Sequence, residues 1–115
     1  MPHLVIEYTS TDDSQINEED LMTAAHWAAV STGIFNESDI KVRAKRYSSA
    51  FVGGRHAQFV HVTIYLIDGR DNDIKKKLTQ TVHDRLVSLF PGYASISVDA
   101  RDLDREVYTK SKSGD

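Results

Sequence analysis

The chain has 115 residues, of which 40% are hydrophobic and 27% charged, and its formal net charge is -3. This size suits one globular domain and is too small for two independent hydrophobic cores. The net charge argues against a strongly basic nucleic-acid binder, and the absence of cysteine excludes disulfides, thiolate metal sites and cysteine nucleophiles.

The first half of the sequence predicts a strand, a helix and a second strand. Residues 4–8 are rich in β-branched and aromatic types and favour a strand. The polar stretch 9–15 favours a turn, after which Asn17 is expected to cap a helix that stops at Gly33. Residues at helical spacing form its core-facing stripe: Leu21, Ala24, Ala25, Ala28 and Ala29. In residues 40–45, apolar side chains alternate with Lys41, Arg43 and Lys45, which predicts a strand with one cationic face.

The second half repeats this order after a connecting segment. Residues 48–58 contain Gly53-Gly54 and predict a hairpin-like connection, and residues 59–67 give the strongest strand signal. Asp71 or Asp73 is expected to cap a second helix, which Pro91-Gly92 ends. Its apolar face is predicted to hold Ile74, Leu78, Val82, Leu86 and Leu89. Residues 96–100 predict a fourth strand, with residues 103–108 as a short extension.

The order β-α-β, β-α-β predicts an α+β fold of two fused units in one domain over residues 1–110. The two halves span about 1–47 and 59–106, and residues 111–115 are expected to form a polar tail, frayed from Lys110 onward. Right-handed crossovers would place both helices on one face of a four-stranded sheet. The other face is left open, and the apolar side chains of residues 59–67 lead us to expect that it packs against other subunits.

Several short motifs follow one another along the chain. They are Met1-Pro2-His3 with Glu7, Thr32-Gly33-Ile34-Phe35, Ile40 followed by Arg43, Phe59-Val60-His61-Val62-Thr63, and Gly69-Arg70. In this order and spacing they resemble the tautomerase superfamily and, within it, the 5-carboxymethyl-2-hydroxymuconate isomerase family. Long members of the superfamily fuse two β-α-β units and form trimers, so the resemblance implies a homotrimer. The first half carries Ser10-Thr11-Asp12-Asp13 where the Gly-Arg pair would fall.

The resemblance implies an isomerase that tautomerises 5-carboxymethyl-2-hydroxymuconate, or a similar 2-hydroxydienoate, in aromatic-acid catabolism. Its catalytic group would be the secondary amine of Pro2, freed when Met1 is removed. Burial and nearby cations lower the pKa of such an amine toward neutral pH, where a general base works best. The alternative is that Pro2 is only a residue at the chain start. If Met1 stays, Pro2 is an amide and cannot be the base.

Four further residues are candidates for binding the small anionic substrate. Arg70 matches the arginine of the Gly-Arg motif, and its planar fork suits a carboxylate. The alternative is that it caps a turn against Asp68 or Asp71. The family has an arginine at the position of Lys41, so either Lys41 or Arg43 is expected to supply the second cation, unless both are simply an exposed cationic face. Phe35 is expected to form part of an apolar wall.

Two other readings of the same residues stay open. One is a different reaction of the same amine, such as a decarboxylase, dehalogenase or hydratase-like activity. The other is a trimeric module without catalysis. No cofactor is implied, because the conjugated carbonyl of the substrate accepts the electrons. No metal is expected either, since the five histidines form no close pair. The N-terminal sequence resembles neither a signal peptide nor a membrane span, so the expected compartment is the cytoplasm.

Overall fold

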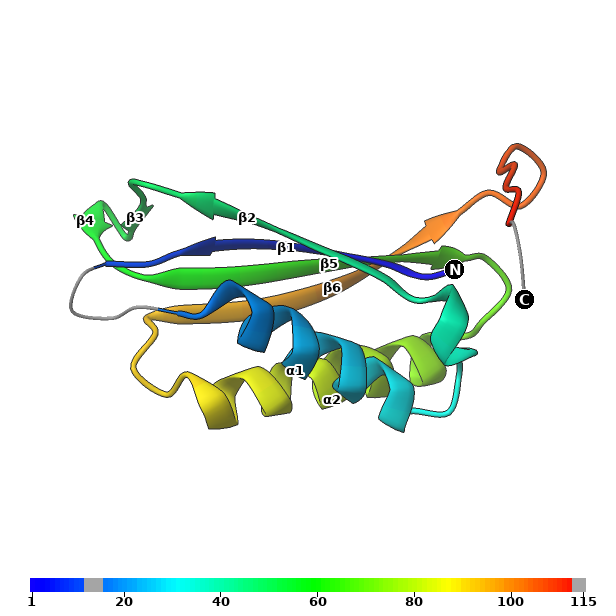
Figure 1. The fold of residues 1–115 in the computed structure, drawn as a ribbon, viewed down its shortest axis with the longest axis horizontal. Helices are drawn as coiled ribbons and strands as arrows, with labels where there is room; N and C mark the ends of the chain where they lie inside the picture. The colour runs from blue at the N-terminus through cyan, green and yellow to red at the C-terminus, as the bar shows by residue number, and fades with distance from the viewer. Residues whose placement is uncertain (12–15, 113–115) are drawn as a thin grey trace.

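Figure 1 presents the fold as a computed structural model, which describes residues 1–11 and 16–112. Two long helices lie side by side against a twisted sheet, and the N-terminus lies at the end of the sheet where the fifth strand finishes. The elements in chain order are β1 (His3–Thr9), α1 (Glu18–Ser31), the 3-10 turn η1 (Glu37–Asp39), β2 (Lys41–Tyr47), β3 (Phe51–Val52), β4 (Arg55–His56), β5 (Phe59–Ile67), α2 (Asn72–Leu89) and β6 (Ser95–Leu103).

The main sheet has the strand order β2-β1-β5-β6. β1 runs parallel to β2 and β5 runs parallel to β6, while β1 and β5 are antiparallel. Each helix therefore makes the crossover between two parallel strands, and both helices cover the same face of the sheet (Figure 1). The predicted fold, two fused β-α-β units with both helices on one face, is confirmed.

The helix caps follow from short polar side chains that accept orphan backbone N–H groups. Asn17 accepts from the amide of Asp20 at 3.2 Å, and Asp71 accepts from that of Ile74 at 2.9 Å.

The core-facing stripe predicted for α1 is buried in full. On the predicted apolar face of α2, Leu78, Val82 and Leu86 are buried. Ile74 and Leu89, in the first and last turns of the helix, are 41% and 42% exposed.

β5 shows strict alternation between the two faces of the sheet. Four of its side chains point under the helices and are fully buried: Val60, Val62, Ile64 and Leu66. The open face instead receives the intermediate set Phe59, His61, Thr63, Tyr65 and Ile67. The period of two therefore sends most aliphatic side chains of this strand into the core, while Phe59, Tyr65 and Ile67 remain half-buried on the open face that we expect to pack against other subunits.

The connecting segments agree with the sequence in part. The hairpin predicted within residues 48–58 forms through the pairing of Phe51 with His56. β6 extends to Leu103, beyond the predicted strand, since it pairs with β5 along its full length. The expected extension beyond it is a turn instead, in which the amides of Val107 and Tyr108 both donate to the carbonyl of Asp104. Residues 12, 13, 14 and 15, which include part of the predicted first turn, lie outside the described residues, as do residues 113–115 of the predicted tail.

Candidate active site

The start of the chain lies at one end of the sheet, where β1 and β2 begin and β5 and β6 finish. The register pairs His3 with Lys41 on one side and with Tyr65 on the other. The amide of Lys41 also donates to the carbonyl of Pro2 at 3.0 Å, and Pro2 is fully buried. Backbone pairing therefore holds the first residues of the chain in place.

The N-terminal amine lies in a cationic environment. The amine of Met1 donates to the carbonyl oxygen of Asp39 at 3.0 Å, and the ammonium of Lys41 donates to the same oxygen at 3.1 Å. Burial, followed by the charges of Lys41 and Lys110, lowers the pKa of this amine from 8.0 to about 6, against the opposing charge of Asp39. A protonated amine is thus disfavoured at this end of the sheet.

His3 links β2 to the C-terminal segment on the open face. Its Nδ1 lies 3.1 Å from Arg43 Nη1, and its Nε2 lies 3.0 Å from the hydroxyl of Tyr108. Because a guanidinium only donates, Nδ1 must accept and the neutral ring carries its proton on Nε2, which donates to Tyr108. Burial and then the charge of Arg43 lower the pKa of His3 and favour this neutral form.

Arg70 lies in the loop between β5 and α2, at the same end of the sheet. It donates to the carbonyl of Ile34 at 3.3 Å, and its guanidinium carbon lies 5.2 Å from the centre of the Phe35 ring. Two predicted site residues, Arg70 and Phe35, are therefore brought together by a cation–π contact. The alternative, in which Arg70 caps a turn against Asp68 or Asp71, is not favoured, because Asp68 pairs with Arg105 and Asp71 caps α2.

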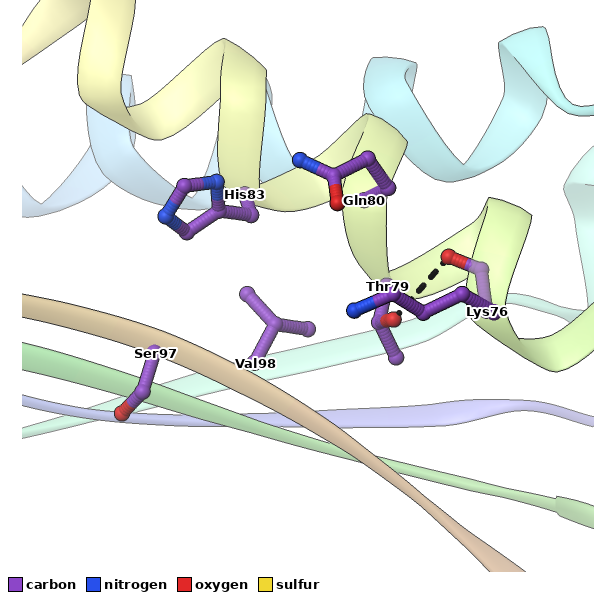
Figure 2. Close-up of a pocket in the computed structure, with 6 residues that line it drawn as sticks. All are labelled: Lys76, Thr79, Gln80, His83, Ser97 and Val98. Carbon is purple, nitrogen blue, oxygen red and sulfur yellow. Dashed lines mark hydrogen bonds between the residues drawn. The ribbon is translucent and has the colours of Figure 1, made fainter.

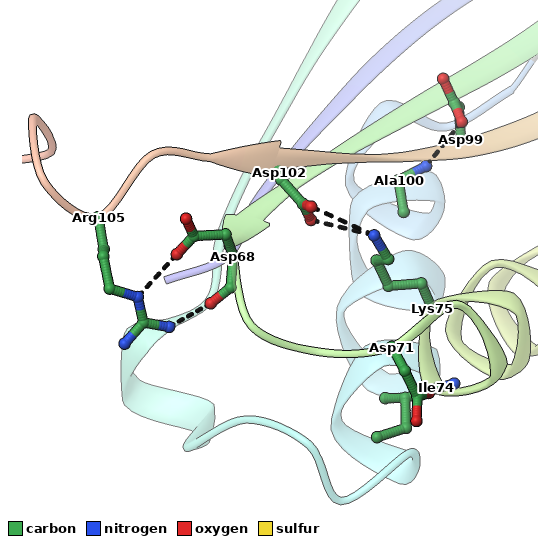
Figure 3. A network of polar contacts seen from close by, with 8 residues as sticks. All are labelled: Asp68, Asp71, Ile74, Lys75, Asp99, Ala100, Asp102 and Arg105. Carbon is green, nitrogen blue, oxygen red and sulfur yellow. Dashed lines mark hydrogen bonds and ion pairs between the residues drawn. The ribbon is translucent and has the colours of Figure 1, made fainter.

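Gly69 allows Arg105 to approach the loop that carries Arg70. Its φ of +115° is unfavourable for other residues, and a Cβ built there would lie 2.8 Å from Nη2 of Arg105. Arg105 Nε donates to the Asp68 carboxylate at 2.7 Å, and Nη2 donates to the Asp68 carbonyl (Figure 3). The Asp-Gly-Arg motif is thus also an anchor for the segment that follows β6.

The C-terminal segment brings two lysines that sequence reasoning missed. Lys110 and Lys112 lie 3.5 Å and 2.9 Å from the same carboxylate oxygen of Asp39. The hydrogen bond from Lys112 is the main cause that lowers the pKa of Asp39 to about 2. The polar sequence from Lys110 onward predicts a frayed tail, and no local pattern indicates that Lys110 pairs with Asp39, the last residue of η1, just before β2 in the distant first half of the chain.

A separate polar hollow of about 310 Å³ lies along the side of α2, facing β6. It is lined by Lys76, Thr79, Gln80, His83, Ser97 and Val98. Figure 2 shows that Val98 points toward the helix whereas Ser97 points away from it, to the open face of the sheet. None of the predicted site residues lines this hollow, so it is not the candidate active site.

Neither a cluster of metal-ligating side chains nor a membrane-spanning helix occurs in the described residues. Across residues 1–11 and 16–112, no three or more His, Cys, Asp or Glu side chains are grouped as metal ligands would be. In that same part of the chain, no helix has the length and apolar character needed to cross a membrane.

Comparison with known proteins gives a family and a fold. Residues 2–112 match the family model described as 5-carboxymethyl-2-hydroxymuconate isomerase. No curated protein matches the sequence.

Solved structures with the same fold have low sequence identity. A 5-carboxymethyl-2-hydroxymuconate isomerase from Deinococcus radiodurans R1 is 22% identical with a TM-score of 0.78, covering 97% of this chain and 90% of that one. Pt0534 inactivated by 2-oxo-3-pentynoate is 13% identical with a TM-score of 0.81, and the match covers 95% of this chain and 91% of that one. A fused 4-OT wild-type symmetric trimer is 18% identical with a TM-score of 0.75, and the match covers 89% of this chain and 85% of that one. The shared architecture is the tautomerase fold.

Replacing Lys41 by Met should raise the pKa of the N-terminal amine from about 6 toward 8.0, since removal of a nearby cation favours the protonated form. Burial is the larger cause and stays, so we expect a partial return. The parent chain has two methionines, Met1 and Met22, and the substitution adds one more at a known position, so [13C]methionine labelling of chain that retains Met1 allows an NMR titration with few signals.

Lys45→Met is the matched control, because Lys45 lies on the same strand and the same face, over the ring of Tyr47. It should leave the titration of Met1 unchanged. Equal shifts in both variants, or no shift in either, would contradict the local effect assigned to Lys41.

Proposed function

Because the chain belongs to the 5-carboxymethyl-2-hydroxymuconate isomerase family, we propose that it tautomerises 5-carboxymethyl-2-hydroxymuconate or a similar 2-hydroxydienoate, with the amine of Pro2 as general base. The observation that supports this most is the environment of the chain start. There the amine of Met1 has a pKa lowered to about 6 by burial, Lys41 and Lys110. Pro2 is the next residue, and consecutive Cα atoms are about 3.8 Å apart. Removal of Met1 would leave the Pro2 amine among the same cations.

The proposed reaction moves one proton and needs no external oxidant or reductant. The neutral amine of Pro2 takes the proton of the 2-hydroxyl group, and the electron pair of that O–H bond forms the carbonyl. The double bonds shift along the chain of the substrate, and a distal carbon takes the proton back from the ammonium. A base whose pKa lies near the working pH accelerates such a step by roughly 100- to 10,000-fold.

Arg70 is the proposed partner of the carboxylate next to the reacting oxygen. Its guanidinium can donate two parallel hydrogen bonds to a carboxylate and stabilise the negative charge of the dienolate. The ring of Phe35 supports the guanidinium from one side at 5.2 Å. A water-poor wall of this kind strengthens the electrostatic attraction between Arg70 and the substrate.

Lys41 is the proposed second cation, in preference to Arg43. Lys41 donates to the same carbonyl oxygen as the N-terminal amine, whereas Arg43 is engaged with His3 Nδ1. An ammonium provides a point charge without the planar fork of an arginine, so it favours charge over a fixed carboxylate orientation. Lys41 would thus help to keep the amine neutral and would attract an anionic substrate.

The chain is further proposed to act in the cytoplasm as a homotrimer. The open face of the sheet carries half-buried side chains such as Val5 and Thr63 and is covered by no helix in the described chain. Fused 4-OT proteins with the same fold form trimers. Packing of three open faces would bury these side chains, which is the physical reason to expect association.

The state of Met1 should decide activity. Chain that lacks Met1 should ketonise 2-hydroxymuconate and its 5-carboxymethyl derivative, followed by ultraviolet absorbance, and chain that keeps Met1 should be inactive because an amide nitrogen is not a base. Intact mass spectrometry establishes which form is assayed. The acetylenic ketone 2-oxo-3-pentynoate should add once to the processed chain, and peptide mapping should locate the adduct on Pro2.

Equal activity of the two forms would exclude Pro2 as the base. An adduct together with no tautomerase activity would instead favour another reaction of the same amine, such as decarboxylation or hydration. Processed chain with neither adduct nor activity would point to a module without catalysis.

Arg70→Ala should lower kcat/KM for a 2-hydroxymuconate by about 100-fold or more, because the site loses a charged hydrogen-bond donor to the developing oxyanion. The matched control is Arg55→Ala, an exposed arginine of β4 at the other end of the sheet, which should keep nearly the parent rate. Parent-like turnover in Arg70→Ala, or an equal loss in the control, would refute the role assigned to Arg70.

The oligomeric state can be measured by light scattering coupled to gel filtration, where we expect three times the mass of the chain. Thr63→Arg adds a long charged side chain to the open face and should dissociate the assembly, while Thr23→Arg on the exposed side of α1 should not. A stable monomer of the parent chain would overturn the trimer.

A further inference from the structure

A hollow lies between the two helices, away from the chain start. α1 and α2 lie side by side and run in opposite directions, as Figure 1 shows. The hollow between them has a volume of about 390 Å³, and we call it the helix groove. Its apolar lining is Ala24, Trp27, Leu89 and Phe90, and its charged residues are Asp20 and Arg85. None of the candidate active-site residues lines it, so the helix groove is a separate place on the molecule.

The helix groove leaves large apolar side chains in contact with water. Trp27 is 53% exposed, and Leu89 is 42% exposed. Ala24 is buried and its side chain is a single methyl group, so it leaves room above it. Exposed apolar side chains around a hollow indicate a place where the apolar part of a ligand can be buried.

The two aromatic side chains of the helix groove are held by neighbouring rings. The ring of His26 meets that of Trp27 edge-on, with the centroids 5.0 Å apart and an angle of 84° between the planes. Nε2 of His26 lies 3.2 Å from Oε1 of Glu37 in η1, which fixes the His26 ring in turn. The ring of Phe90 lies 6.1 Å from that of Tyr93. A ligand would therefore meet side chains that are already positioned, which lowers the entropy cost of binding.

Asp20 and Arg85 carry opposite charges and line the same hollow without pairing. Within residues 1–11 and 16–112, the carboxylate of Asp20 and the guanidinium of Arg85 have no ion pair and no hydrogen bond. Lys75 of the same helix is instead paired with Asp102 at 3.3 Å. A free carboxylate and a free guanidinium beside an apolar wall complement a ligand that carries both an ammonium and a carboxylate.

The two charges and the aromatic wall together indicate one class of ligand. In an aromatic α-amino acid the ammonium and the carboxylate are attached to one carbon, and the ring lies one methylene group away. Contact between two aromatic rings adds to the free energy gained by burying their area. We propose that the helix groove binds an aromatic α-amino acid, with its carboxylate on Arg85, its ammonium on Asp20 and its ring against Trp27. This site is independent of the proposed tautomerase activity.

Trp27 is the only tryptophan of the chain, so its fluorescence and its indole N–H signal in NMR report directly on the helix groove. L-Phenylalanine should shift both signals in a saturable way, with a Kd on the order of 1 mM, as expected for a small ligand in an open groove. 3-Phenylpropionate lacks the ammonium and phenethylamine lacks the carboxylate. Each should bind about three- to tenfold more weakly than L-phenylalanine, because one ion pair is lost.

Two substitutions separate the two charges. Arg85→Gln should weaken L-phenylalanine about three- to tenfold and leave phenethylamine unchanged, since that ligand has no carboxylate. Asp20→Asn should weaken L-phenylalanine by a similar factor and leave 3-phenylpropionate unchanged. Lys76→Gln is the matched control, because Lys76 is a cation of the same helix that lines the polar hollow facing β6. It should keep the parent affinity for all three ligands.

Several results would overturn the proposal. One is the absence of a saturable shift of the Trp27 signals with L-phenylalanine, and another is equal weakening of all three ligands in Arg85→Gln. Arg70→Ala should leave the response of Trp27 intact, and its loss there would place the ligand at the candidate active site instead. A Trp27 shift that follows the concentration of the chain without ligand would show that a second copy covers the helix groove, which would also overturn the proposal.

Discussion

The pairing of β1 on both of its edges is the constraint on which the rest of the site depends. β1 is an inner strand, parallel to β2 and antiparallel to β5, and it begins at residue 3. Its inward side chains Leu4 and Ile6 are fully buried, as is Pro2. A chain end that is normally frayed is therefore held by backbone hydrogen bonds and by apolar burial. The terminal amine has a fixed position as a consequence.

The antiparallel contact of the two halves brings the candidate site residues to one end of the sheet. The first half contributes the chain start and Lys41, while the second half contributes the loop with Arg70. β5 opens the second β-α-β unit as β1 opens the first, and it begins at Phe59, at the opposite end of the sheet. Phe59 lies in the middle of the chain, so its backbone nitrogen is an amide and not a free amine. Fusion of the two units thus leaves one end with an amine and the Gly-Arg pair.

The cations at this end have both a structural cost and a chemical use. Lys41, Lys110 and Lys112 repel one another. The carboxylate of Asp39 pairs with Lys110 and Lys112, while Lys41 donates to the backbone carbonyl of the same residue. The same positive field disfavours protonation of the amine, and an amine must be unprotonated to act as a general base. An anion bound at this end of the sheet would offset part of the repulsion among these cations.

The sequence by itself determined the elements and the caps, because these depend on near neighbours. The alternation in β5, the buried stripe of α1 and the caps Asn17 and Asp71 follow from periods of two and 3.6 residues and from short polar side chains. The motifs also predicted Pro2, Arg70, Lys41, Arg43 and Phe35 as a set.

Only the tertiary structure decided that Phe35 contacts Arg70, that Arg43 contacts His3, and that Tyr108 and Lys110 lie beside the chain start. Those contacts join residues far apart in the sequence, and no local periodicity encodes which distant side chains a folded sheet brings to the same end.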